Sequence, residues 1–290
     1  MWRTEEQRDW AAAIALIGGL FAIRLAALVA SPLNLGPDEA QYWRWSTDLA
    51  FGYYSKPPLI AWAIALTTGL LGDAEWAVRF SAPLLHGVAT LLVYDLGRRM
   101  AGPKIGWLAV LCYGLAPGVV LASGVISTDT VLLPFWCLAL WSLWRLRTEK
   151  SWGLAAALGV AIGFGFLAKY AMVYALLGFA VTLTWDGRLR TSLASKYGAV
   201  AVAIASVLIA PHLMWSSSSG FSTIAHTADN ANWGGAPIQP ANALRFLADQ
   251  MGVFGPVPFL LLVALAASAI RRPRALNEAD RFLLAFILPP

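Results

Sequence analysis

The stretch from Leu35 to Pro58 reads LGPDEAQYWRWSTDLAFGYYSKPP and follows directly on an apolar segment at 10–30. It combines an adjacent Asp-Glu pair with two cations, five Tyr and Trp side chains and a Lys-Pro-Pro turn. Of the 290 residues, 59% are hydrophobic and only 13% are charged, whereas roughly a quarter of the residues of a soluble domain carry charge. In so apolar a chain, this charged cluster is the first candidate for a working site.

The other apolar residues fall into continuous blocks close to the roughly 20 residues that a helix needs to cross a bilayer. We therefore predict an all-α, polytopic transmembrane bundle that forms a single domain over 1–290, with eight or nine spans. The predicted spans lie near 10–30, 77–97, 105–122, 129–146, 152–168, 170–185, 197–215 and 253–270. A ninth begins near 281 and stops inside an apolar run at Pro290, so we expect the C-terminal part of the protein to be missing.

The apolar block Leu59–Leu71 decides the predicted topology, because its 13 residues are too few to span comfortably. We interpret it as an interfacial or re-entrant helix, which places the N-terminus and four short loops on one side of the membrane. That side then carries 15 of the 21 Lys and Arg residues, namely Arg3, Arg8, Arg98, Arg99, Lys104, Arg145, Arg147, Lys150, Arg188, Arg190, Lys196, Arg271, Arg272, Arg274 and Arg281.

Basic loops favour the cytoplasmic side, so the two long segments at 31–76 and 216–250 are expected to face outward. The net charge of +5 is then explained by the basic loops that orient the protein in the membrane, and no nucleic-acid partner is expected.

Two aspartates on the outward side are the predicted catalytic carboxylates. Asp38 heads a segment in which Tyr42, Trp45 and Leu49 share its helix face, which predicts an amphipathic helix on the membrane surface. Acids after Gly-Pro are also an ordinary helix start. Asp129 begins the span at 129–146 and faces the same side, although helix capping explains it equally well.

The predicted substrate-binding residues surround these carboxylates. Glu39 adjoins Asp38, and the aromatic side chains, Tyr42 and Tyr54 among them, fit either an interfacial belt or a surface for stacking a sugar ring. Lys56, Arg79 and Lys169 are cations at the membrane edge that can meet a phosphate. Lys56 can instead extend to the membrane surface, and Arg79 can pair with Glu75 one turn earlier.

The long segment at 216–250 includes SSSSGFSTIAHTADNANWGG, and it is either a linker or a binding loop. His226, with Asp229 three residues later, is the remaining predicted binding residue, for a sugar or, less favoured, a divalent metal.

Four motifs together resemble the membrane glycosyltransferases of family 39. They are the Asp-Glu pair in the first outer loop with the aromatic helix, GYYSKPPL followed by AVRFSAPLL, STDTVLL, and GFLAKYAMVY. HTADNANW is similar to bacterial members. The family includes protein O-mannosyltransferases and bacterial enzymes that add aminoarabinose, galactosamine or galacturonic acid to lipid A. One departure is Ser55, where the aminoarabinose enzymes carry a Glu before the motif Lys.

The resemblance implies a GT-C fold with interfacial helices in the first outer loop. It also implies inverting transfer of a sugar from a polyprenyl-phosphate donor to a lipid or glycolipid acceptor of the cell envelope, such as lipopolysaccharide. Asp38 is then the principal catalytic residue and Asp129 its support, with no cofactor expected. The expected location is the bacterial inner (plasma) membrane, with the active site toward the periplasm. The alternative from a different class is a transporter or lipid flippase without transferase chemistry.

Overall fold

The computed structural model describes residues 4–231, 240–271 and 276–287, and within these ranges the chain is helical and has no strand. The first half holds α1 Glu5–Val29, α2 Pro37–Ser46, α3 Leu59–Leu71, α4 Glu75–Arg79, α5 Ser81–Ala101, α6 Pro103–Gly114, α7 Pro117–Ala122 and α8 Thr128–Leu146. The second half holds α9 Trp152–Ala168, the 3-10 turn η1 Tyr170–Met172, α10 Val173–Trp185, α11 Gly187–Leu193, α12 Lys196–Ser218, α13 Ser222–Ala231, α14 Pro240–Phe254, α15 Pro256–Arg271 and α16 Glu278–Ile287.

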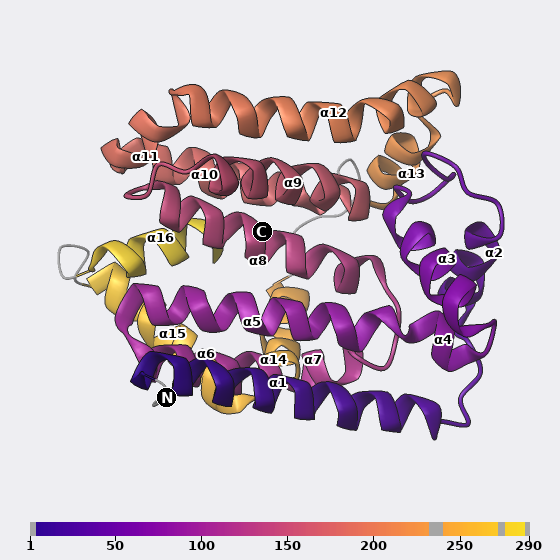
Figure 1. The fold of residues 1–290 in the computed structure, drawn as a ribbon, viewed down its shortest axis with the longest axis horizontal. Coiled ribbons are helices and arrows are strands. Elements are labelled where there is room, and N and C mark those ends of the chain that lie inside the picture. Colours follow the sequence, from indigo (N-terminus) through magenta and orange to yellow (C-terminus); the bar gives the residue numbers. More distant parts are fainter. Residues whose placement is uncertain (1–3, 232–239, 272–275, 288–290) are drawn as a thin grey trace.

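The long helices α1, α5, α8, α9 and α12 lie side by side in that order (Figure 1). Apolar side chains fill the space between neighbouring helices, with Leu143, Leu158 and Met172 among those fully or almost fully buried. Helices α9 and α12 approach closely because α9 presents glycines to α12. A Cβ on Gly159 would lie 2.6 Å from the Ala201 carbonyl oxygen, and one on Gly163 would lie 2.7 Å from Leu208. Small residues permit such contacts between membrane helices.

The protein is a multi-pass membrane protein. In the described part of the chain, three helical segments are both long and apolar enough to cross a bilayer, namely Glu5–Val29, Glu75–Ala101 and Lys196–Ser218. The shorter apolar helices of the bundle lie among them. Helix α3 does not run alongside the long helices. It gathers with α2 and α4 at one end of the bundle, to the right in Figure 1. We call this the α2–α4 end.

The opposite end, the arginine end, joins the segments that the topology prediction placed on one side. Arg98 and Arg99 lie in the last turn of α5. Arg98 pairs with Glu6 near the N-terminus, and Arg99 pairs with Glu149 in the loop after α8. Arg147 pairs with both Asp186 before α11 and Glu278 at the start of α16. These contacts bring five segments of the chain together. Arg3, Arg272 and Arg274, which the prediction also placed there, lie outside the described residues.

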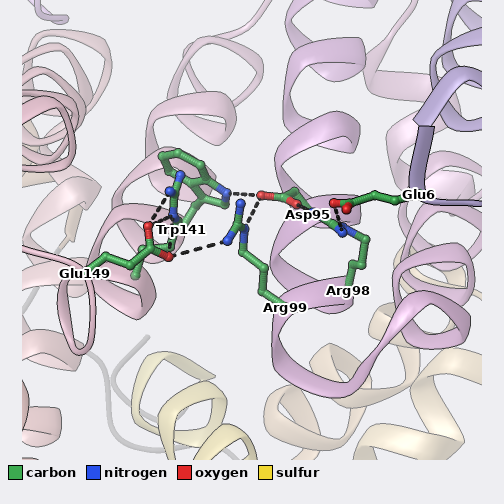
Figure 2. Close-up of polar contacts among 7 residues, drawn as sticks. Glu6, Asp95, Arg98, Arg99, Trp141 and Glu149 are labelled. Atoms are coloured by element: carbon green, nitrogen blue, oxygen red, sulfur yellow. Dashed lines mark hydrogen bonds and ion pairs between the residues drawn. The ribbon is translucent and has the colours of Figure 1, made fainter. Parts of the chain in front are cut away.

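Asp95 is the centre of the network in Figure 2. One carboxylate oxygen accepts from Trp141 Nε1 at 2.7 Å and from Arg99 Nε at 2.5 Å, and the other accepts from Arg98 Nη2 at 2.9 Å. The Asp95 side chain is only 7% exposed. Arginines from α5 and an indole from α8 thus neutralise and solvate one buried carboxylate.

Two elements differ from the sequence prediction. The expected single span at 105–122 is broken into α6 and α7 at Leu115 and Ala116, because Pro117 has no N–H for the helical ladder and restricts the residue before it. The Arg24 guanidinium donates to the carbonyl of Gly114, which ends α6. The segment at 216–250, predicted as a long loop, also contains helices within its described residues, namely α13 and most of α14.

Candidate active site at the α2–α4 end

The start of α2 separates two adjacent carboxylates. Pro37 occupies the first helical turn and Gly36 is the N-cap, whose N–H donates to Glu39 Oε2 at 2.9 Å. Glu39 therefore turns back toward the protein and is 3% exposed, while Asp38 points to the exposed side of the helix. Sequence alone treats the two acids alike, but the structure gives them different surroundings.

Glu39 forms a bidentate ion pair with Arg79 at the end of α4. Arg79 Nη2 lies 2.7 Å from Oε2 and Nε lies 2.9 Å from Oε1. Arg79 also donates to the carbonyls of Leu33 and Asn34, at 3.0 and 2.9 Å. The partner of Arg79 is thus Glu39, and the alternative pairing with Glu75 is wrong. Contact of Glu39 or Arg79 with substrate stays a prediction. Their bonds to each other and to the backbone do not favour it, because these bonds already occupy the polar groups of both side chains.

The same carboxylate joins the starts of α2 and α8, the helices that carry the two predicted catalytic aspartates. The backbone N–H of Ile126, three residues before Asp129, donates to Glu39 Oε1 at 3.0 Å. Burial alone would raise the pKa of Glu39, but the bonds from Arg79, Gly36 and Ile126 outweigh burial and lower it. Glu39 is therefore an ionised, fully bonded anchor that holds the start of α2 beside the start of α8.

Asp129 does not cap α8. The cap is Ser127, whose hydroxyl accepts from the Thr130 N–H at 3.2 Å. The Asp129 side chain is 65% exposed and pairs with Lys169, whose ammonium lies 2.7 and 2.8 Å from the two carboxylate oxygens. Lys169 occupies the extended residue between α9 and η1. The structure therefore brings together two predicted site residues that are 40 positions apart.

Tyr42 lies on α2, one turn after Asp38. Its ring is 3% exposed, and burial raises the pKa of its hydroxyl to about 12, assisted by the negative charges of Asp38 and Asp129. Both carboxylates are thus within electrostatic reach of one phenol, which stays protonated at neutral pH. Asp38, Tyr42, Asp129 and Lys169 form one cluster, which we call the aspartate cluster.

Lys56 lies in the turn before α3, where the Tyr53 N–H donates to the Lys56 carbonyl at 3.1 Å. Its side chain is half-buried. Within the described ranges, no carboxylate lies within 4.0 Å of its ammonium, in contrast to Arg79 and Lys169, which both have acidic partners. Lys56 is the predicted phosphate-binding cation that keeps its charge available.

Tyr54 and His226 meet at the rim of this end. Tyr54 is 65% exposed, and its ring centroid lies 5.2 Å from that of His226 on α13. Thr223, also on α13, donates to the Tyr53 carbonyl at 2.6 Å and attaches this helix to the segment between α2 and α3. Among the residues that the structure describes, no group of three His, Cys, Asp or Glu side chains could hold a metal. Trp233, in the HTADNANW motif, lies outside them.

Sequence reasoning missed His212 on α12. Its Nδ1 lies 2.6 Å from the carbonyl oxygen of Phe51, and its Nε2 lies 2.7 Å from the hydroxyl of Tyr170. The imidazole thus connects the segment between α2 and α3 to α12 and to the 3-10 turn η1. The available signal was a histidine within an apolar span, which needs polar partners when buried.

Comparison with known proteins agrees with this architecture. The family described as dolichyl-phosphate-mannose-protein mannosyltransferase matches residues 55–215. The chain is 40% identical to the lipid A galacturonosyltransferase RgtD of Rhizobium johnstonii over 228 residues, covering 78% of this chain and 48% of RgtD. It is 28% identical to undecaprenyl phosphate-alpha-4-amino-4-deoxy-L-arabinose arabinosyl transferase 1 of Pseudomonas fluorescens, covering 97% of this chain and 54% of that protein.

Among solved structures, the chain resembles ArnT from Cupriavidus metallidurans in its crystal structure bound to undecaprenyl phosphate. The TM-score is 0.71 at 18% identity, and the match covers 94% of this chain and 53% of that one. This likeness confirms the predicted helical GT-C fold. The chain spans about half the length of the relatives it matches.

Proposed function

The chain belongs to the dolichyl-phosphate-mannose-protein mannosyltransferase family, and from that premise we propose that it transfers a sugar from a polyprenyl-phosphate donor to a lipid acceptor of the cell envelope. The observation that carries the proposal is the aspartate cluster at the α2–α4 end. The turn between α2 and α3 at this end also carries the available cation Lys56. The names of the similar proteins, which specify lipid A and undecaprenyl phosphate, support a lipid on each side of the reaction.

In the proposed reaction an acceptor hydroxyl attacks the anomeric carbon of the donor sugar. The new bond forms between that oxygen and the carbon, and the hydroxyl proton moves to the carboxylate of Asp38. The bond between the carbon and the phosphate oxygen breaks on the opposite face, so the configuration inverts. The electron pair stays on the polyprenyl phosphate, where Lys56 stabilises the additional negative charge.

The contrast between Asp38 and Glu39 selects the base. A general base must reach the proton that it removes, and Glu39 already accepts from Arg79, Gly36 and Ile126. Asp38 is exposed next to it. Asp129 has a supporting role, because its exposed carboxylate keeps the Lys169 ammonium at the same surface.

The proposed location is the inner membrane, with the α2–α4 end in the periplasm. The arginine end would then face the cytoplasm, as the positive-inside rule requires. Lipid-linked donors suit a compartment without nucleotide sugars.

The test is Asp38→Asn in membranes supplied with a lipid-linked sugar and a lipid A acceptor. We expect transfer to fall by about 10²- to 10⁴-fold, the usual contribution of a general base. Glu75→Gln, an exposed acid at the same end of the bundle, is the matched control and should transfer normally. Undiminished transfer by Asp38→Asn would refute the role given to Asp38.

A further inference from the structure

A cavity at the α2–α4 end adjoins the aspartate cluster through the contact of Trp45 with Tyr42. Its volume is about 440 Å³, and its lining includes the aromatic side chains of Trp45, Tyr53, Tyr54 and Trp215. Arg44 and Asp48 contribute charge to it. Ligand cavities of proteins commonly measure about 300–1,000 Å³ and combine apolar walls with a few polar groups. The transfer chemistry proposed above uses none of these six side chains.

The first aromatic wall is held by stacking and hydrogen bonds. The rings of Trp45 and Tyr53 are nearly parallel, with their centroids 4.7 Å apart. The Tyr53 hydroxyl lies 3.0 Å from the carbonyl oxygen of Trp45 and accepts from the Ala50 N–H at 3.1 Å. Because the hydroxyl is bonded to backbone on both sides, the ring has a fixed orientation and keeps the cavity open.

The second wall is Trp215 of α12, which lies directly on the backbone of Gly52. A Cβ at position 52 would be 2.2 Å from the indole, so only glycine permits this contact. The other neighbour of the indole is His212, nearly parallel to it at 6.1 Å and bonded to the Phe51 carbonyl. Trp215 is therefore positioned by packing, and a ligand would meet a wall that is already formed.

The two charged groups lie one turn apart. Arg44 is at the C-terminal turn of α2, and Asp48 follows the helix. Arg44 is exposed and donates to the Thr47 hydroxyl. In the part of the chain that the structure describes, no carboxylate lies within 4.0 Å of its guanidinium. A guanidinium without an acidic partner suits a phosphate or carboxylate, and the Asp48 carboxylate suits hydroxyl or amino groups.

We propose that this cavity binds a sugar ring that carries an anionic substituent, with the ring between the aromatic walls and the anion at Arg44. The inference rests on the proposed function, because a lipid-linked sugar or a phosphorylated glycolipid supplies this chemistry. Tyr42 of the aspartate cluster contacts Trp45 of the cavity, with ring centroids 5.5 Å apart. A donor or acceptor headgroup bound in this cavity would therefore lie close to Asp38, the proposed site of transfer.

The experiment measures binding of glucose 1-phosphate to the full chain in lipid nanodiscs by calorimetry, with glucose and inorganic phosphate as separate probes. We expect the sugar phosphate to bind more tightly than either part. Arg44→Gln should weaken its binding at least about tenfold, as the loss of a charge-assisted contact predicts. Tyr54→Ala should weaken binding of the sugar phosphate without affecting binding of inorganic phosphate. Arg190→Gln, an exposed arginine at the opposite end of the bundle, is the matched control and should bind normally.

Equal binding by Arg44→Gln and wild type would overturn the proposal, as would inorganic phosphate binding as tightly as the sugar phosphate. Transfer kinetics then identify the source of the headgroup. A raised KM for the acceptor assigns the cavity to the acceptor, a raised KM for the donor assigns it to the donor, and an unchanged KM for both rejects the site.

The variant Asp38→Asn separates the two proposals, because it should lose transfer and still bind glucose 1-phosphate. If Asp38→Asn transfers normally, the proposed role of Asp38 fails while the binding result on the cavity stands.

Discussion

The two ends of the bundle treat charge in opposite ways. At the arginine end, Asp95 accepts from three donors, and Arg147 pairs with two carboxylates. At the α2–α4 end, Asp38 is exposed and Lys56 has no acidic partner among the described residues. Charged side chains that form ion pairs with one another stabilise a fold, whereas charged side chains without such partners are available to bind a substrate.

Glu39 and Arg79 refine this comparison, because they form one fully bonded ion pair at the α2–α4 end. Their side chains are 5% and 6% exposed, so this pair is more buried than the arginines around Asp95, which are 18% and 31% exposed. The comparison therefore predicts two separable classes of variant. One class should lose stability and keep the chemistry, and the other should lose chemistry and keep stability.

The largest effect on stability is expected for Asp95→Ala. Removing this carboxylate leaves Arg98, Arg99 and the Trp141 N–H without their shared partner. Breaking a buried ion pair costs about 3–5 kcal/mol of unfolding free energy. Denaturant unfolding in detergent measures the loss, and any protein that remains folded should keep its KM for both substrates. Glu6→Gln is the control, since the Glu6 side chain is 65% exposed. A raised KM in folded Asp95→Ala would break the separation of the two ends.

Lys56→Met is expected to lower the transfer rate without lowering stability, the opposite of Asp95→Ala. Removing one group that stabilises a developing negative charge costs about 10²- to 10³-fold in rate. The unfolding midpoint should stay at the wild-type value, because the ammonium has no ion pair to lose. Single-turnover transfer with saturating donor measures the rate, and Lys104→Met at the arginine end is the matched control. A lowered midpoint with normal transfer would place Lys56 among the structural residues.

A smaller, pH-dependent effect is expected from Glu39→Gln. Because the folded state lowers the pKa of Glu39, the ionised pair contributes its full stability above the ordinary carboxyl pKa of about 4.3. That contribution falls as the pH drops through this value toward the lower folded pKa. The difference in Tm between wild type and Glu39→Gln should therefore be greatest at neutral pH and shrink in acid. A difference that is constant from pH 7 to pH 3.5 would contradict the assignment of Glu39 as an ionised anchor.

The smallest effect on stability is expected for Lys169→Met. The pair with Asp129 is exposed to solvent, and such pairs contribute about 0.2–1 kcal/mol. Urea unfolding should change by no more than this amount, while transfer falls because Asp129 loses the cation that it positions. If stability falls by several kcal/mol and transfer does not change, the pair belongs with the saturated charges of the arginine end.

The sequence predicted much of the architecture, for identifiable physical reasons. Continuous apolar blocks predicted the helices, and the 13-residue length of Leu59–Leu71 correctly separated α3 from the long helices of the bundle. The close contact that Gly159 and Gly163 make with α12 agrees with the small residues in that apolar block. The break at Pro117 was missed because the apolar pattern continues across it.

The candidate site was less accessible from sequence. The different surroundings of Asp38 and Glu39 arise from contacts 40 and 87 residues away, with Arg79 and Ile126. Local patterns contain no such information, so Glu39 and Arg79 were grouped with the substrate-binding residues. The pair of Asp129 with Lys169 also depends on how α8 and α9 pack. The cavity of Arg44 and Trp215 joins α2 to a helix that begins 150 residues after α2 ends, and no spacing rule indicates it.

The bond from the Ile126 N–H to Glu39 has a practical consequence for structural work on the proposed transferase. The starts of α2 and α8, which carry Asp38 and Asp129, are joined through Glu39 and Ile126, and neither aspartate takes part in that contact. Replacing Asp38 by its amide should therefore abolish the proposed transfer while leaving the architecture intact. An inactive form prepared in this way is suited to cryo-electron microscopy with both lipids present.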